Sequence, residues 1–217
     1  YASRGLGDVY KRQVVNAISD VVIGERGKKL YIRTFAYSEE EYKSTVGCIK
    51  HIKSDKVILM MKETPHDFFL THPDNPYIRK MNRPTIVEFD SGNEYSGQGV
   101  VANTWPEYTM KRWGSYINCP NVTGYVARTD RYGDTSIVGT ANEIQLYALK
   151  RMTEEQTVSP MQIYNEFITS RYGEDALLPI RKAFQNAYDI VTSVFYTLGT
   201  NLTDHSSLNY ENNKWGY

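Results

Sequence analysis

The chain has 217 residues, 41% of them hydrophobic, and its 25 Lys and Arg residues balance 25 Asp and Glu residues. This hydrophobic content is enough for a packed core in one large domain or two small ones. A net charge of zero argues against nucleic-acid and membrane-surface partners. No apolar run approaches the roughly 20 residues that a membrane-spanning helix needs.

The cysteine and histidine content predicts no metal site, and we expect no cofactor. Cys48 and Cys119 are too few and too far apart for a disulfide framework, so both are predicted to be buried thiols. The four histidines lack the close i, i+4 pairing of a helical zinc site. The 18 Tyr and three Trp are a bias typical of sugar-binding surfaces, because aromatic faces stack on sugar rings.

Residues 1–13 show no hydrophobic period and lack the apolar stretch of a signal peptide. Codons that encode Ser3 to Gln13 can be written to match a transposon adapter used in sequencing libraries. We therefore interpret residues 1–13 as a non-native adapter-like stub, and we expect the native sequence to begin near Val14 as part of a longer gene. The alternative is an ordinary frayed N-terminus.

Helix-like and strand-like stretches alternate from Val14 onward. The first helix places Val14, Val15, Ile18 and Val21 or Val22 on one face, and the glycines at 24 and 27 end it. Residues 28–37 are strand-like because they are rich in β-branched and aromatic side chains. Ser38, with Glu41 three residues later, predicts the start of a second helix.

Three further strands are predicted, in residues 56–63, 83–95 and 121–130. The near-continuous apolar run in residues 56–63 is typical of a parallel strand covered on both faces. Four strands with long connections predict an α/β protein with a parallel sheet. About four βα units of a partial (β/α)8 TIM barrel in residues 14–135 fit this pattern, and an open two-layer or doubly wound sheet fits it equally.

Residues 136–217 predict an all-helical C-terminal domain that ends before its natural terminus. One helix is expected in residues 139–156. Another begins with Ser159 as its N-cap, Pro160 in the first turn and Gln162 completing a capping box, and ends at Gly173. Residues 174–199 predict one long helix that bends near Pro179.

Polar side chains follow the predicted strands at their carboxyl ends, where α/β proteins place their chemistry. Asp67 and Glu94 follow neighbouring strands, and such a pair of carboxylates suits glycoside hydrolysis. Arg33 and Lys62 add fixed positive charge suited to a sugar carboxylate. The alternative is that Arg33–Glu94 and Lys62–Asp67 are structural ion pairs.

Three motifs carry a resemblance to a known family: YIRTFAY (31–37), VILMMKETPHDF (57–68) and TIVEFDSGNEYSGQG (85–99). In this order and spacing they resemble the second half of the barrel of the α-glucuronidases of glycoside hydrolase family 67. GYVARTDRYGDTSIVGTANEIQLYALKRM (124–152) is similar to the last strand and the opening of the helical domain of that family. The resemblance covers about residues 14–175.

This resemblance implies an inverting hydrolase that removes (4-O-methyl)glucuronic acid from xylan-derived oligosaccharides. Arg33 and Lys62 match positions that bind the uronic acid carboxylate, and Asp67 and Glu94 match the carboxylates that activate water. The general acid of the family is a Glu on a strand that would precede Val14, so we expect this chain alone to be inactive. The helical domain of the family commonly contributes to dimerisation, which implies a homodimer.

The sequence departs from the family pattern near the predicted site, and these departures leave two alternative functions open. The family has Asn-Gly before the motif proline and Gln after Asp-Phe, where this chain has Glu63, Thr64 and Phe69. A glycosidase of the same scaffold acting on a different sugar, or a non-catalytic carbohydrate-binding descendant, therefore remains possible. For Trp105 and Trp113, packing in a core or interface is favoured over stacking on sugar.

Overall fold

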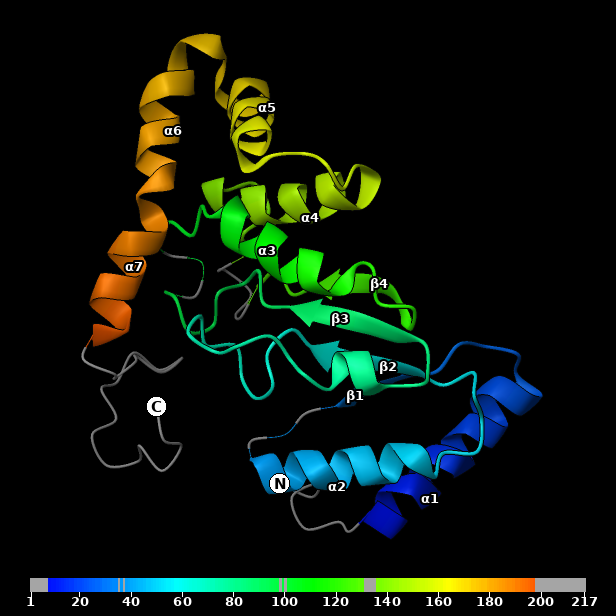
Figure 1. The fold of residues 1–217 in the computed structure, drawn as a ribbon. Coiled ribbons are helices and arrows are strands. Elements are labelled where there is room, and N and C mark those ends of the chain that lie inside the picture. The colour runs from blue at the N-terminus through cyan, green and yellow to red at the C-terminus, as the bar shows by residue number, and fades with distance from the viewer. Residues whose placement is uncertain are drawn as a thin grey trace. The chain divides into compact units, whose positions relative to one another are not determined.

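The computed structural model describes residues 8–34, 36, 38–97, 99, 101–130 and 136–197. It is a mixed α/β protein with a four-stranded sheet in the order β1-β2-β3-β4 (Figure 1). The strands are Tyr31–Thr34 (β1), Ile58–Lys62 (β2), Thr85–Phe89 (β3) and Val122–Ala127 (β4). The predicted parallel α/β sheet is therefore confirmed.

The helices lie before, between and after the strands. Those before β4 are Asp8–Ser19 (α1), Glu39–Lys50 (α2) and Pro106–Tyr116 (α3), with a π-helical turn at Asp20–Glu25 and a 3₁₀ turn at Ile78–Lys80. Those after β4 are Ile144–Glu154 (α4), Pro160–Tyr172 (α5), Leu177–Gln185 (α6) and Ala187–Phe195 (α7), with 3₁₀ turns at Ala141–Glu143 and Glu174–Ala176. None of the helices in the described part of the chain is both long and apolar enough to cross a membrane.

The chain divides into two compact units. The first takes in the described residues up to 67 together with 73–88 and 118–126, and the second takes in 68–72, 89–117 and the described residues from 127 onward. The first unit contains α1, α2 and most of the sheet. The second contains α3 and the later helices. The predicted domain boundary near residue 135 falls beside residues 131–135, which lie outside the described residues.

In the first unit, strand pairing follows the hydrophobic pattern. Strands β1 and β2 pair in parallel, as do β2 and β3, with Leu59 opposite Thr85 and Met61 opposite Val87. Leu59, Met61 and Val87 are completely buried on one face of the sheet. Side chains alternate across a strand, so the intervening residues of β1, β2 and β3 share the opposite face.

Helix α1 begins at Asp8, within the segment that we interpret as a stub, while residues 1–7 lie outside the described residues. The predicted apolar row of this helix is present but is largely open to solvent, because Val14, Ile18 and Val21 are 40–45% exposed. Helix α2 begins as predicted, since the Ser38 hydroxyl accepts a hydrogen bond from the Glu41 amide.

The core of the second unit joins α3, α4, α5 and α6. Its members are apolar side chains that are at most 9% exposed: Met110, Ile144, Ala148, Val158, Ile163, Tyr164, Phe167, Ile168 and Phe184.

Trp105 and Trp113 are each 2% exposed, and the Trp113 Nε1 donates to Thr153 Oγ1 at 2.9 Å. The expectation that both tryptophans serve packing is confirmed.

Two sequence predictions for the helices differ from the structure. Helix α3 was not predicted, although Pro106 in its first turn is a recognisable start signal. The expected long helix over 174–199 is instead a 3₁₀ turn followed by α6 and α7, with the break at Asn186. Pro179 lies in the first turn of α6, where the missing amide proton removes no helical hydrogen bond, so it causes no bend.

Candidate functional site

Charged side chains gather at the carboxyl ends of β1, β2 and β3 in the first unit. Arg33 is opposite Met60 in the strand register, and Lys62 is opposite Glu88. Met60 and Lys62 are two residues apart on one strand, so Arg33, Lys62 and Glu88 share one face of the sheet. Parallel strands therefore bring two cations and a carboxylate to the same face.

Arg33 forms a bidentate ion pair with the carboxylate of Glu88. Its Nε lies 2.7 Å from one carboxylate oxygen of Glu88, and its Nη2 lies 2.8 Å from the other. The Glu88 side chain is 7% exposed and that of Arg33 is 37% exposed. Arginine binds carboxylates well in this geometry, because its planar donors match the two oxygens. Sequence reasoning missed Glu88 as a site residue.

Lys62 forms a buried ion pair with Asp67. The Lys62 Nζ lies 2.5 Å from Asp67 Oδ1, and the two side chains are 3% and 14% exposed. Burial lowers the pKa of Lys62, while the charge of Asp67 and their hydrogen bond oppose that shift. The charges of Arg33 and Glu88 also act on Lys62, which places these four side chains in one electrostatic cluster.

Asn75 holds the chain between Lys62 and Asp67 in place. Its side-chain amide donates to the carbonyls of Lys62 and Thr64 at 2.9 and 3.3 Å, and its own backbone amide donates to the Glu63 carbonyl at 2.9 Å. Thr64 adds a hydroxyl bond to the Asp67 carbonyl at 2.9 Å. The loop that positions Asp67 is therefore tied to the end of β2 at several points.

Glu94 belongs to the second unit, where it pairs with Arg128. The Arg128 Nη1 lies 2.8 Å from Glu94 Oε2, and the Glu94 side chain is 8% exposed. The Asp90 carboxylate accepts a hydrogen bond from the Glu94 amide at 2.6 Å and lies 3.4 Å from the Arg128 Nε. Arg128, the second residue that sequence reasoning missed, stands just after β4.

The turn before Glu94 requires unusual backbone geometry. Asn93 has a φ of 58°, in the left-handed region that asparagine tolerates better than most residues. At Gly92 an added Cβ would lie 3.1 Å from the Asp130 backbone nitrogen, so a side chain there would crowd the neighbouring main chain. These two positions explain part of the SGNE sequence.

Helices from the C-terminal region support this turn within the second unit. Gln145 in α4 donates to Asn93 Oδ1 at 3.2 Å and to the Asn103 carbonyl at 2.6 Å. Tyr196, just after α7, accepts from the Leu70 amide at 3.2 Å and donates to the Tyr95 carbonyl at 3.0 Å. Residues on both sides of Glu94 are thus held by the helical part of the chain.

The predicted site residues fall into two groups. Arg33, Lys62 and Asp67 lie together in the first unit, and Glu94 lies in the second. Of the two structural ion pairs considered from the sequence, Lys62–Asp67 forms, whereas Arg33 pairs with Glu88 and Glu94 with Arg128. Among the described residues, no group of three or more His, Cys, Asp and Glu side chains is arranged to hold a metal ion.

No family model matches the sequence, and no curated protein shows a significant match to it.

Proposed function

We propose that this chain is part of an inverting α-glucuronidase that removes (4-O-methyl)glucuronic acid from xylan-derived oligosaccharides. The single observation that carries the proposal is the cluster of Arg33, Lys62, Asp67 and Glu88 at the carboxyl ends of adjacent parallel strands. We further propose that the sheet is part of a (β/α)8 barrel, in which that end of the strands is the active-site end.

In this mechanism, Arg33 and Lys62 bind the carboxylate of the uronic acid and orient the ring. Their present partners, Glu88 and Asp67, are carboxylates at 2.7 and 2.5 Å, so the cluster already holds the type of group that the substrate would present. Substrate binding then requires the uronate to share these cations with the protein carboxylates. Loss of either cation should raise KM and also lower kcat.

Asp67, Glu94 or both hold and deprotonate the attacking water on the face opposite the leaving group. A Glu supplied from outside residues 14–217 protonates the leaving oxygen. Inversion needs room for that water, so the acid and base carboxyl groups should be about 6.5–9.5 Å apart in the complete enzyme. Deprotonation of the water by a positioned base is typically worth about 10²- to 10⁴-fold in rate.

The test joins this chain to the upstream barrel half and measures release of glucuronic acid from glucuronoxylan oligosaccharides. We expect Asp67→Ala, Glu94→Ala or both to lower kcat by about 10²- to 10⁴-fold, and Asp55→Ala, in an exposed loop, to leave it unchanged. The first product detected by NMR should be the β-anomer. Activity like that of the parent in both carboxylate variants would refute the mechanism.

One observation favours a second candidate, a glycosidase of the same scaffold that acts on an uncharged sugar. Both cations of the cluster are already paired with protein carboxylates, so no substrate anion is needed to balance their charge. A panel of oligosaccharides with and without a sugar carboxylate separates the two candidates. Equal turnover of both classes would support the uncharged substrate.

A further inference from the structure

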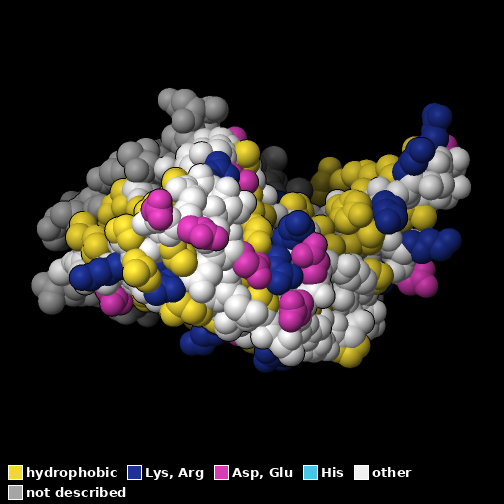
Figure 2. Space-filling view, turned by 90° about the horizontal axis from the view of Figure 1, so that it is seen from above, with side chains coloured by type: hydrophobic (Ala, Val, Ile, Leu, Met, Phe, Trp, Pro, Cys, Tyr) yellow, Lys and Arg dark blue, Asp and Glu magenta, His cyan; other side chains and the backbone are white. Residues whose placement is uncertain are grey.

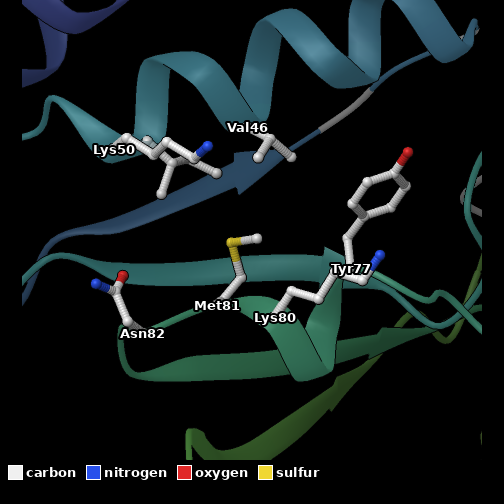
Figure 3. A pocket seen from close by; sticks show the side chains of 7 residues that line it. Val46, Lys50, Tyr77, Lys80, Met81 and Asn82 are labelled. Carbon is white, nitrogen blue, oxygen red and sulfur yellow. The ribbon is translucent and has the colours of Figure 1, made fainter.

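The first unit contains a hollow of about 370 Å³ between α2 and the segment 77–82 (Figure 3). Val46, Ile49 and Lys50 reach it from α2, and Tyr77, Lys80 and Met81 reach it from the opposite segment. It is formed by residues of one unit only and does not include the cluster around Lys62.

The lengths of the two strand connections explain why space is left at this point. The β1–β2 connection contains the 12-residue helix α2, whereas the β2–β3 connection contains only the three-residue 3₁₀ turn Ile78–Lys80. Parallel strands are usually joined by a crossover connection of about a dozen or more residues that contains an α-helix. Residues of this short turn and its flanks line the hollow opposite the C-terminal half of α2.

The inner surface of the hollow is apolar and well supported. Ile49 and Met81 are 4% and 9% exposed, so they form its buried base, and Val46 is half-buried beside them. The Tyr77 ring stacks on Tyr42 with 4.1 Å between ring centroids, which fixes one aromatic side of the hollow. An apolar ligand would therefore contact a buried base and an aromatic ring whose positions are already fixed by packing.

The rim is positively charged. Lys50 and Lys80 are both exposed, and none of the described residues that line the hollow is acidic. Within the described residues, neither lysine takes part in an ion pair. The Lys80 Nζ lies 5.3 Å from the centre of the Tyr77 ring. Two ammonium groups beside an apolar surface favour a ligand that has one anionic group and an otherwise apolar body.

We propose that this hollow binds a small organic monocarboxylate with an aromatic or medium-length aliphatic body. Its volume lies at the lower end of the 300–1,000 Å³ typical of small-molecule sites. The apolar base and the Tyr77 ring take the body of the ligand, and Lys50 and Lys80 take the carboxylate. An inorganic anion would gain nothing from the apolar base. This inference does not depend on the glycosidase proposal.

The test titrates the full chain, labelled with ¹⁵N, with 4-phenylbutyrate and with the uncharged 4-phenylbutan-1-ol. We expect the carboxylate to shift the amide signals of Ile49 and Met81 and to bind at least about fivefold more tightly than the alcohol. The double variant Lys50→Gln/Lys80→Gln should remove this preference, and 0.5 M NaCl should reduce it. Lys56→Gln, an exposed lysine outside the hollow, should change neither affinity.

A second variant, Val46→Phe, fills the hollow without changing its charge and should abolish binding of both compounds. Thermal unfolding of each variant checks that the fold is kept, and the lysine variants decide the question if Val46→Phe does not fold. Absence of binding, equal affinity for the acid and the alcohol, or an unchanged preference in the lysine double variant would each overturn the proposal.

Discussion

Each cation of the candidate site is matched by a carboxylate from the chain itself. The Lys62–Asp67 pair is the more buried of the two, with side chains 3% and 14% exposed, and the Arg33–Glu88 pair keeps the arginine 37% exposed. Removing one partner of a buried pair leaves an unbalanced charge in a region that water hardly reaches, and this usually costs more than removing both partners. The buried pair therefore has a structural role that is separable from any catalytic role.

Asp67→Ala is expected to lower the free energy of unfolding by about 3–5 kcal/mol. The double variant Lys62→Met/Asp67→Leu should recover most of that loss, because it removes both charges and keeps the volume filled. Lys150→Ala removes one member of an exposed pair with Glu154 and should change stability by less than about 0.5 kcal/mol. Urea unfolding measures all three. A loss in Asp67→Ala as small as that in Lys150→Ala would contradict this expectation.

At the scale of single elements, the starts of α2 and α5 show how local sequence sets a helix boundary. In α5 the Ser159 hydroxyl accepts from the Gln162 amide at 3.2 Å, and Gln162 Oε1 accepts from the Ser159 amide at 2.9 Å. This reciprocal pair satisfies amides that the first helical turn leaves without a backbone partner. Since the next residues of α5 belong to the core of the second unit, the cap also positions part of that core.

Ser159→Ala is expected to destabilise the protein by about 1 kcal/mol, because the Gln162 amide loses its acceptor. Ser170→Ala, at an exposed position of the same helix, makes the same chemical change outside the cap and should be nearly neutral. The measurement is the free energy of unfolding in urea for each variant. Equal effects of the two substitutions would show that the cap contributes nothing specific.

At the scale of the whole molecule, the surface mixes both signs of charge with exposed apolar side chains. On the face seen in Figure 2, basic and acidic side chains are interspersed, in line with the zero net charge of the sequence. Ile190 and Val194, one helical turn apart on α7, are 57% and 63% exposed. Exposed apolar side chains mark an association surface when they belong to a large contiguous patch, so this row is a place to test for association.

The homodimer through the helical region, implied by the family resemblance, remains a prediction and can be tested on these residues. We expect the full chain to form a dimer in sedimentation equilibrium and Ile190→Glu/Val194→Glu to be monomeric at the same concentration. Val14→Glu/Ile18→Glu alters a similarly exposed row on α1 in the first unit and serves as the matched control. A monomeric parent chain, or dissociation only in the control variant, would contradict a helical-region dimer.

Much of the local structure could be predicted because the signals are close together in the sequence. The four strands follow from short β-branched and apolar runs, and the α5 boundaries follow from Ser159, Pro160, Gln162 and Gly173. Helix α3 was missed although both of its signals are local: Pro106 marks the start, and Met110, Trp113 and Tyr116 recur at helical spacing on its buried face. The break at Asn186 was also missed, since neither a glycine nor a proline marks it.

The sequence by itself determined the parallel sheet, the helix caps at Ser38 and Ser159, and the placement of the four candidate site residues at or beyond the carboxyl ends of their strands, because these features depend on neighbouring residues. Only the tertiary structure decided which charges meet. Glu88 pairs with Arg33 across 55 residues of chain, and Gln145 reaches Asn93 across 52. Such partners depend on strand register and on helix packing, which bring together side chains that no local pattern relates.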